Sequence, residues 1–450
     1  MKLKLLLAAS AASTMALGLG APAFAAKYIL LKNGNGFPSN LDAKVIAAGG
    51  VLEKIYPFGV AIASGPDAGL NVSGVQTVKD YGFDTEQEER VTAEDLAEFG
   101  FPPNSDDNDR FFNLQYGHNY VGAQQSWELG FRGAGVRVAV LDTGFDTDHP
   151  DLAPGIDFAS SADMTGQGLT YAINDPFSHG SHTAGTIGAR DNGIGTIGVA
   201  PEVTLVLVKV LLDSGSGSFE DVIEGIYHAA NQNVQVMNMS LGAVIPRGGP
   251  GTNEISALAN AVRHAMSYAR QQGVTVVTSA GNAASDLDGD GGNVRFQTGL
   301  GHNVGVSATT GVGWYANGGA NTGQDLIPTS YTNYGTSMVD HAAPGGDTLY
   351  PGNENCGVST PPTVTVRPCW VLDLIFSTGS NLNPAIASYY WSGGTSMAAP
   401  HAAGVAALII SETGDSNPAH VEAEMRRRAV EGGKPGNDDF FGQGQANTGN

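Results

Sequence analysis

Residues 136–142 read VRVAVLD, a valine-rich run that ends on an aspartate. Three further apolar runs follow it, namely TLVLVKVL at residues 204–211, VQVMNMS at 234–240 and VTVVTSAGN at 274–282. A strand that is apolar on both faces is typical of a parallel sheet covered by helices on both sides. The four runs therefore predict buried parallel strands.

Two segments between these runs have helical spacing. They are FEDVIEGIYHAANQN at residues 219–233 and EISALANAVRHAMSYARQQG at 254–273, the second closed by Gly273. Apolar residues recur there at intervals of three and four, as on the buried face of a helix. Strands that alternate with helices predict an α/β fold with a mainly parallel sheet.

Polar residues stand where these elements end or begin. Asp142 closes the first run, Asn282 closes the fourth, and His179 lies in SHGSHTAGTIGA before another helical stretch. Ligand chemistry in parallel sheets gathers at the carboxyl ends of the strands. An aspartate, a histidine, an amide and a serine are the parts of an acyl-transfer site.

The serine is Ser396, in SGGTSMAAPH at residues 392–401. Gly393 and Gly394 allow a sharp turn before the apolar helix that follows, and Pro400 is early enough in that helix to cost little. The helix start places N–H groups and the positive end of the helix dipole beside Ser396. Each motif alone is more often a turn or a helix cap, but their combination favours catalysis.

The segments DTG, HGSHTAG and GTSMAAP, in this order, resemble the three signature segments of the subtilisin-like serine peptidases, or subtilases. The resemblance spans nearly the whole chain after residue 108. The order in which the aspartate, the histidine and the serine follow one another along the chain is the one known from this family. It implies a three-layer α/β sandwich with a mainly parallel sheet. It also implies that Ser396 is the nucleophile, His179 the general base, Asp142 the residue that orients it and Asn282 an oxyanion donor.

The same resemblance implies a substrate site and structural calcium. Two segments would pair with an extended peptide substrate, a mode that accepts many sequences; they comprise Leu212, Asp213, Ser214, Ser240, Leu241 and Gly242. Side-chain and carbonyl oxygens of a loop and two aspartates would bind Ca²⁺, which prefers such ligands; they belong to Asp109, Asp151, Arg190, Asn192, Ile194 and Thr196.

A second candidate calcium site is DLDGDG. Asp286, Asp288 and Asp290 are spaced like the start of a calcium loop, but Gln297 stands where an EF-hand loop ends in glutamate. A solvated acidic turn explains these residues equally well.

The N-terminal part has a different character. Residues 1–25 combine Lys2 and Lys4 with a short apolar run and an A-x-A pattern, which predicts a secretory signal peptide. Residues 26–84 read as strands and one helix and resemble the family's inhibitory propeptide, a small ferredoxin-like α+β unit. Residues 85–108 are acidic and contain a Pro-Pro pair, so we expect a linker and processing region there, followed by the peptidase domain at residues 109–450.

Composition limits the partners. The net charge of −22 repels phosphate backbones and anionic membrane surfaces, so we expect neither a nucleic-acid nor a membrane partner. We expect a secreted monomer, extracellular or periplasmic, that binds protein or peptide substrates and its own propeptide. Export also predicts a disulfide between Cys356 and Cys369.

Two alternatives remain for the activity. The sedolisins share a GTS-type serine but use a glutamate base, against which the intact HGSH segment argues. A catalytically inactive secreted binding module is the alternative from another class.

The apolar walls in MNMSLG and VVTSAGN predict broad cleavage after large apolar residues, although GNAASDLDGDGGNVRF replaces part of the pocket that the family uses.

Overall fold

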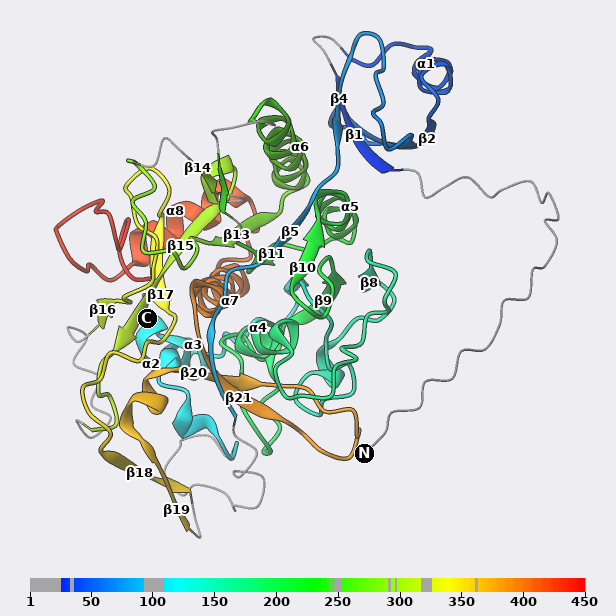
Figure 1. Ribbon diagram of the computed structural model, residues 1–450. Coiled ribbons are helices and arrows are strands. Elements are labelled where there is room, and N and C mark those ends of the chain that lie inside the picture. The colour runs from blue at the N-terminus through cyan, green and yellow to red at the C-terminus, as the bar shows by residue number, and fades with distance from the viewer. Residues whose placement is uncertain are drawn as a thin grey trace, which may run out of the picture.

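The computed structural model describes residues 26–32, 36–92, 109–242, 244–246, 252–289, 293–295, 298–316, 326–360 and 363–449. A small N-terminal unit lies against a larger unit that is described from residue 109 onward, and residues 82–92 cross the larger unit (Figure 1). No helix within these ranges is both long and apolar enough to cross a membrane. The expected signal peptide at residues 1–25 lies outside the described residues.

The small unit is a four-stranded antiparallel sheet with one helix. Its strands are β1 (Ala26–Lys32), β2 (Val51–Ile55), β3 (Val60–Gly65) and β4 (Val75–Lys79), in the order β2-β3-β1-β4. Helix α1 (Leu41–Ala47) buries Leu41 and Val45 on one face of the sheet. This strand order is that of a ferredoxin-like fold, but residues 66–74 form turns and irregular backbone where the full motif has a second helix.

The larger unit is built on a central sheet with strand order β16-β15-β13-β11-β7-β9-β8, and β17 pairs with β15. All of its described pairings are parallel except that of β16. The four predicted strands are confirmed as β7, β9, β11 and β13. The bounds are β7 (Arg137–Asp142), β8 (Ala162–Asp163), β9 (Thr204–Lys209), β11 (Val236–Met239), β13 (Thr275–Ser279), β15 (Val304–Gly311), β16 (Leu326–Pro328) and β17 (His341–Pro344).

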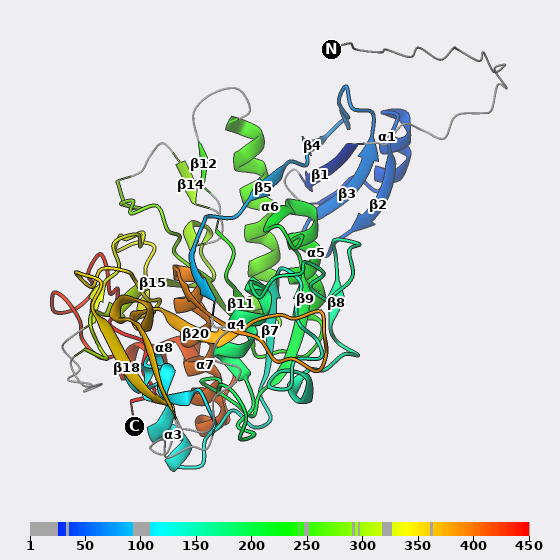
Figure 2. The ribbon, with the colours of Figure 1, turned by 60° about the horizontal axis from the view of Figure 1, so that its bottom comes forward.

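Helices cover both faces of this sheet, which makes the three layers (Figure 2). Helices α4 (His179–Gly188), α7 (Thr395–Thr413) and α8 (Pro418–Arg428) share one core with Val138 and Val140 of β7. Helices α5 (Phe219–Ala230) and α6 (Thr252–Gln271) share the other core with Leu141. Alternate residues of one strand thus enter opposite cores, which is why the strand reads as continuously apolar.

The remaining elements lie around this sandwich. Helices α2 (Gly117–Val121) and α3 (Ala123–Glu128) follow the start of the larger unit, and β12 (Val244–Pro246) pairs with β14 (Asn293–Arg295). Strands β18 (Asn355–Thr360) and β19 (Thr363–Pro368) form a hairpin. The predicted disulfide between Cys356 and Cys369 is confirmed at one end of this hairpin.

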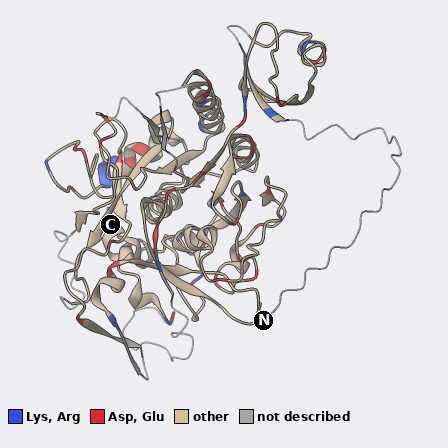
Figure 3. Cartoon of the chain, viewed as in Figure 1, with Lys and Arg blue, Asp and Glu red and all other residues tan. Residues whose placement is uncertain are grey.

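The segment of residues 82–92, here called the crossing segment, pairs with the larger unit twice. Its β5 (Gly82–Asp84) is antiparallel to β10 (Ser216–Ser218), and its β6 (Glu89–Thr92) is antiparallel to β21 (Tyr389–Gly393), which also pairs with β20 (Ile375–Thr378). Acidic residues run along it (Figure 3). The expected linker is therefore a bound strand in its first part, while residues 93–108 lie outside the described residues.

The small unit packs against α5 and α6 with the sheet face opposite α1. Tyr56 stacks on Phe58, and both rings contact Tyr227 of α5 at centroid distances of 5.1 and 6.0 Å. Ion pairs flank this aromatic contact, with Lys27 bound to Glu220 at 3.1 Å and Lys54 bound to Glu224. The Asp80 carboxylate accepts hydrogen bonds from the first backbone N–H groups of α5. These contacts combine an apolar centre with a charged rim.

Candidate active site

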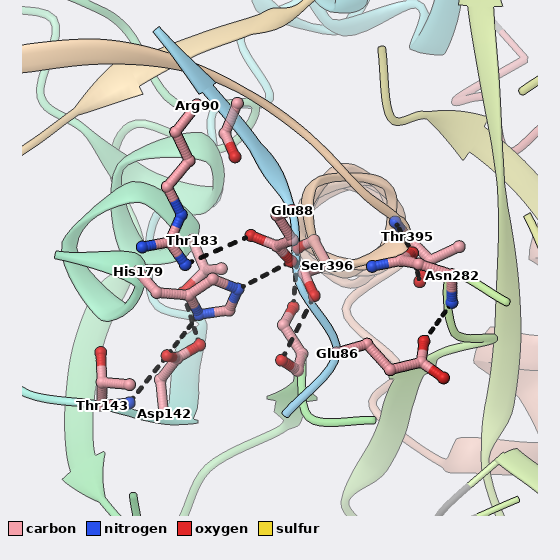
Figure 4. Close-up of polar contacts among 12 residues, drawn as sticks. Glu86, Glu88, Arg90, Asp142, Thr143, His179, Thr183, Asn282, Thr395 and Ser396 are labelled. Atoms are coloured by element: carbon pink, nitrogen blue, oxygen red, sulfur yellow. Dashed lines mark hydrogen bonds and ion pairs between the residues drawn. The ribbon is translucent and has the colours of Figure 1, made fainter. Parts of the chain in front are cut away.

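Asp142 and His179 meet at the carboxyl edge of the central sheet. Asp142 is fully buried at the end of β7, and its Oδ1 lies 2.6 Å from Nδ1 of His179, the first residue of α4. The Thr143 N–H and the Thr183 hydroxyl also donate to the Asp142 carboxylate, at 2.7 and 3.1 Å. Asp142 is thus fixed to hold the imidazole in one orientation (Figure 4).

Ser396 is the second residue of α7 and is 7% exposed. Pro400, four residues further on, has no N–H to bond the Ser396 carbonyl, and the Ser240 hydroxyl donates to that carbonyl at 2.8 Å instead. Pro400 therefore lies inside the helix at little cost because a side chain from the end of β11 satisfies the freed acceptor. The same contact fixes the backbone of Ser396.

Asn282 follows β13, and its side-chain oxygen accepts hydrogen bonds from the Thr395 N–H at 2.9 Å and the Thr395 hydroxyl at 2.7 Å. This fixes the orientation of the amide, whose nitrogen then points toward Ser396 (Figure 4). An amide N–H held beside a serine hydroxyl is suited to bind an oxyanion.

Glu88 of the crossing segment lies on both catalytic candidates. Its Oε1 is 3.2 Å from His179 Nε2, it lines the same cavity as Ser396, and Arg90 lies 3.9 Å from its other oxygen. Burial lowers the pKa of His179, but the Asp142 and Glu88 carboxylates outweigh burial and raise that pKa to about 10. Burial raises the pKa of Glu88, but His179 and Arg90 outweigh it and lower that pKa to about 2. His179 is therefore an imidazolium in this state.

The second histidine of the HGSH segment is a structural residue. His182 is fully buried, and its Nε2 lies 3.1 Å from the Ile375 carbonyl oxygen. Burial and the neighbouring His179 lower the pKa of His182 to about 3, so it stays neutral.

The strand that pairs with the crossing segment lies further along than expected. We expected Leu212, Asp213 and Ser214, but these residues enter the turn in which the Leu212 N–H bonds Ser216. Strand β10 and Gly215 make the pairing instead, and Gly215 accepts the Thr85 N–H at 3.3 Å. A tight turn at residues 212–214 directly precedes β10, and the sequence pattern alone did not distinguish the turn from the strand.

Ser240, Leu241 and Gly242 border the same site. Ser240 and Gly242 line the cavity that also contains Glu86, Asn282 and Ser396. Leu241 is buried in the core that α5 and α6 share. Of these three residues, Ser240 and Gly242 therefore face the cavity and Leu241 anchors their segment.

The residues expected to bind calcium lie together. Asp109 and Asp151 are fully buried, and the Asp109 carboxylate accepts the N–H groups of Gly193 and Ile194 at 3.1 and 3.2 Å. The Asp151 carboxylate accepts the Thr196 N–H at 2.9 Å and the Asn192 amide at 3.3 Å. Two buried carboxylates thus converge on the loop at residues 190–196.

The fit of a calcium ion there depends on oxygen atoms of several kinds. In the described parts of the chain, no group of three or more His, Cys, Asp and Glu side chains could hold a metal ion. The Arg190 side chain turns to the carbonyls of Pro201 and Val203, so only its carbonyl could be a ligand. Two carboxylates with amide and carbonyl oxygens are a chemically suitable set for Ca²⁺.

The second candidate calcium site is not assembled among the described residues. The Asp286 carboxylate accepts hydrogen bonds from the N–H groups of Asp288 and Gly289. The Asp288 carboxylate instead accepts hydrogen bonds from the Ser337 N–H and the Thr336 hydroxyl. The two carboxylates therefore serve different turns. Asp290 and Gln297 lie outside the described residues.

Sequence reasoning missed several residues that shape the site. Thr143, Thr183 and Thr395 orient Asp142 and Asn282, and each follows or precedes a predicted catalytic residue within its motif. Glu86 and Glu88 were assigned to a linker because their segment has no core pattern. The run TEQEER, so close before the peptidase domain, was the available signal.

Comparison with known proteins agrees with this geometry. Residues 133–444 match the model of the subtilase family. The major intracellular serine protease of Bacillus subtilis (strain 168) is 33% identical over 323 residues, covering 70% of this chain and 83% of that protein. Thermitase of Thermoactinomyces vulgaris is 32% identical over 315 residues, covering 68% and 85%.

Among solved structures, fervidolysin from Fervidobacterium pennivorans, described as a keratinolytic enzyme related to subtilisin, has the same fold. Its TM-score is 0.67 at 22% identity, over 96% of this chain and 61% of that one. At this identity the likeness concerns the fold alone, and it extends over nearly the whole of this chain.

Proposed function

The chain belongs to the subtilase family and is a serine endopeptidase, and on that premise we propose that Ser396, His179 and Asp142 carry its catalysis. The observation that supports this most directly is the 2.6 Å bond between Asp142 and His179, with Ser396 at the start of a helix on the same edge of the sheet. The three residues come from β7, α4 and α7, so the core holds them in place.

The proposed reaction has two steps. Ser396 Oγ attacks the carbonyl carbon of the peptide bond while His179 Nε2 takes its proton, and His179 then gives that proton to the leaving amine. Water, deprotonated by His179, next hydrolyses the acyl-enzyme and returns Ser396. Asp142 stays ionised throughout and stabilises the imidazolium.

The negative charge that develops on the carbonyl oxygen needs donors. Asn282, fixed by Thr395, supplies its amide, and the N–H of Ser396 at the start of α7 supplies a second donor. Loss of one such amide donor raises the barrier by about 3 kcal/mol, a value measured in this same family.

The substrate in this proposal binds as an extended strand beside β10. The crossing segment already occupies that position with backbone hydrogen bonds, including that of Thr85 to Gly215. Main-chain pairing of this kind accepts protein or peptide substrates of many sequences.

We further propose that the protein is made as a secreted precursor that processes itself. Residues 1–25 would be the signal peptide, residues 26–84 the inhibitory propeptide, residues 85–108 the processing region and residues 109–450 the peptidase domain. The crossing segment supports this, because it fills the cleft of its own molecule and joins it to the small unit. Such intramolecular positioning makes the first cut independent of protein concentration.

Structural calcium completes the proposal. Asp109 and Asp151, the Asn192 side chain and carbonyls of the loop at residues 190–196 would hold the ion. Its role is to neutralise two buried carboxylates and fix the loop, with no part in the chemical steps.

The proposal is tested with a serine-directed fluorophosphonate on matured protein. We expect labelling of wild type and of Ser330→Ala, an exposed control, and none of Ser396→Ala. Unlabelled wild type would favour the inactive binding module. In addition, secreted Ser396→Ala protein should keep the residues from 26 to about 100 that wild type loses.

A further inference from the structure

The crossing segment passes over Ser396 in a defined direction. Residues 82–84 pair with β10 before the site, and residues 89–92 pair with β21 beyond it. Each pairing fixes the register of the backbone at one end. Residues 85–88 are therefore fixed at both ends where they pass over the catalytic residues.

Glu86 is anchored on one side of Ser396. Its carboxylate accepts the backbone N–H of Asn282 and lies beside Gly281, where a Cβ would come within 3.0 Å of its Oε2. The glycine thus leaves the room that the Glu86 side chain occupies. A Cβ on Gly242 would also lie in contact with Glu86, at 3.9 Å.

Glu88 is anchored on the opposite side, on His179. Figure 4 shows Ser396 between the Glu86 and Glu88 side chains. The bonds of the chain that join these two anchors are Glu86–Gln87 and Gln87–Glu88, so these are the candidates for cleavage.

The chemistry of acyl transfer distinguishes these two bonds. The carbonyl that is attacked must lie on the side of the oxyanion donor, Asn282, and the leaving amine on the side of the proton donor, His179. Glu86 is the residue held at Asn282, so its carbonyl is the one presented to the oxyanion donors. The amine that leaves toward His179 is then that of Gln87.

The geometry points to Glu86–Gln87 as the bond that the chain cuts first in itself, an inference that rests on the proposed self-processing. Ser396 Oγ bonds to the Glu86 carbonyl carbon, the C–N bond to Gln87 breaks, and the Ser396 proton passes through His179 to the Gln87 amine. Water then releases a carboxylate on Glu86 and restores Ser396.

This assignment also gives the pocket beside Gly281 a substrate preference. The pocket accepts a glutamate side chain and offers it the Asn282 N–H, a favourable partner for a carboxylate. The sequence alone had predicted a preference for large apolar residues at this position. We infer that an acidic residue is accepted there.

The test uses the full-length chain, refolded and sampled at the earliest times by intact mass spectrometry. We expect an N-terminal fragment that ends at Glu86 and a C-terminal fragment that begins at Gln87. A first cut at any other bond overturns the assignment while leaving self-processing intact. The absence of any cut, together with absent fluorophosphonate labelling, overturns both the assignment and the proposed function.

Matched variants test the pocket. Glu86→Lys should slow the first cut at least tenfold, because a cation replaces the acceptor of the Asn282 N–H. Glu86→Gln, which keeps an acceptor oxygen, should restore the rate to within a few-fold of wild type. Glu89→Lys, at the exposed neighbouring glutamate, should leave the rate unchanged. Equal rates for Glu86→Lys and wild type at the same bond would overturn the role of the Glu86 side chain.

Discussion

Replacing Glu88 by glutamine in the full-length chain tests whether this carboxylate delays the first cut. In the structure Glu88 holds His179 as an imidazolium, and an imidazolium cannot take the proton of Ser396. In the proposed self-processing, the precursor must therefore lose that proton before it can cut itself. Glu88→Gln keeps the size of the side chain and removes its charge.

The expected magnitude follows from the pKa of His179. With that pKa at about 10, the neutral imidazole is about one molecule in a thousand at pH 7. A hydrogen bond between buried charged groups contributes about 1.5–3 kcal/mol, and its loss lowers the pKa by about one to two units. We therefore expect the first cut at pH 7 to be about 10 to 100 times faster in Glu88→Gln.

The sign of the pH dependence is fixed by the same pKa. Because the pKa of His179 is raised, the reactive neutral form appears as the pH rises, and the rate of the wild-type first cut should increase from pH 6 toward pH 10. In Glu88→Gln the whole curve should lie at lower pH. Single-turnover self-cleavage, followed by intact mass spectrometry at several pH values, measures both curves, with Glu89→Gln as the matched control.

A second measurement concerns stability. The pKa of Glu88 is about 4.5 in the unfolded chain and about 2 in the folded one, so its ionised carboxylate stabilises the folded state above pH 4.5. This stabilisation is lost as the pH falls toward 2. The raised pKa of His179 stabilises it below 6.5 and loses this effect as the pH rises toward 10. In a Ser396→Ala background, Glu88→Gln should therefore lower the free energy of unfolding most between pH 4.5 and 6.5.

The reasoning about the first cut would be refuted if wild type and Glu88→Gln gave the same curve of cleavage rate against pH.

Three further predictions concern other parts of the site. Ser240→Ala should lower the free energy of unfolding by about 1–3 kcal/mol, because the buried Ser396 carbonyl then lacks a donor, as urea titration would measure. Chelation of calcium should lower the melting temperature, since an ion at a thousandfold excess over Kd contributes about 4 kcal/mol, and Asp151→Asn should abolish the difference. Burial raises the pKa of Asp80 to about 7, so its contribution to stability falls as the pH rises from 4 to 7; urea titrations of the Ser396→Ala precursor should show this slope, and Asp80→Asn should remove it.

Much of the fold could be predicted because the central strands are buried on both faces. Strands β7, β9, β11 and β13 read as apolar runs, and their polar ends identified the edge where the site lies. Strand β15 was not predicted, since VGVSATTG contains glycines and hydroxyl residues instead of a continuous apolar run, although all eight positions are buried. Its pairing with two parallel neighbours outweighs this local composition.

The crossing segment could not be predicted for a different physical reason. Its residues carry no apolar period, and its strands exist only because β10 and β21 offer unpaired backbone groups. A strand held by its partners in this way leaves no signal in its own composition. The turn at residues 212–214 and the pairing strand at 216–218 could not be separated for the same reason, because in LLDSGSGS they differ only in the partner they meet.

Helix α7 has a consequence for how the enzyme loses activity on heating. From Thr395 to Ile410 every residue of this helix is buried, and its side chains contribute to the core on one face of the sheet. Backbone amides in such a position exchange with solvent only when the whole domain opens. Ser396, the proposed nucleophile at its start, should therefore not be displaced by local fraying, so inactivation should coincide with exchange of the slowest-exchanging amides of the molecule. Strand β10 is half-exposed, so its amides should exchange before those of α7.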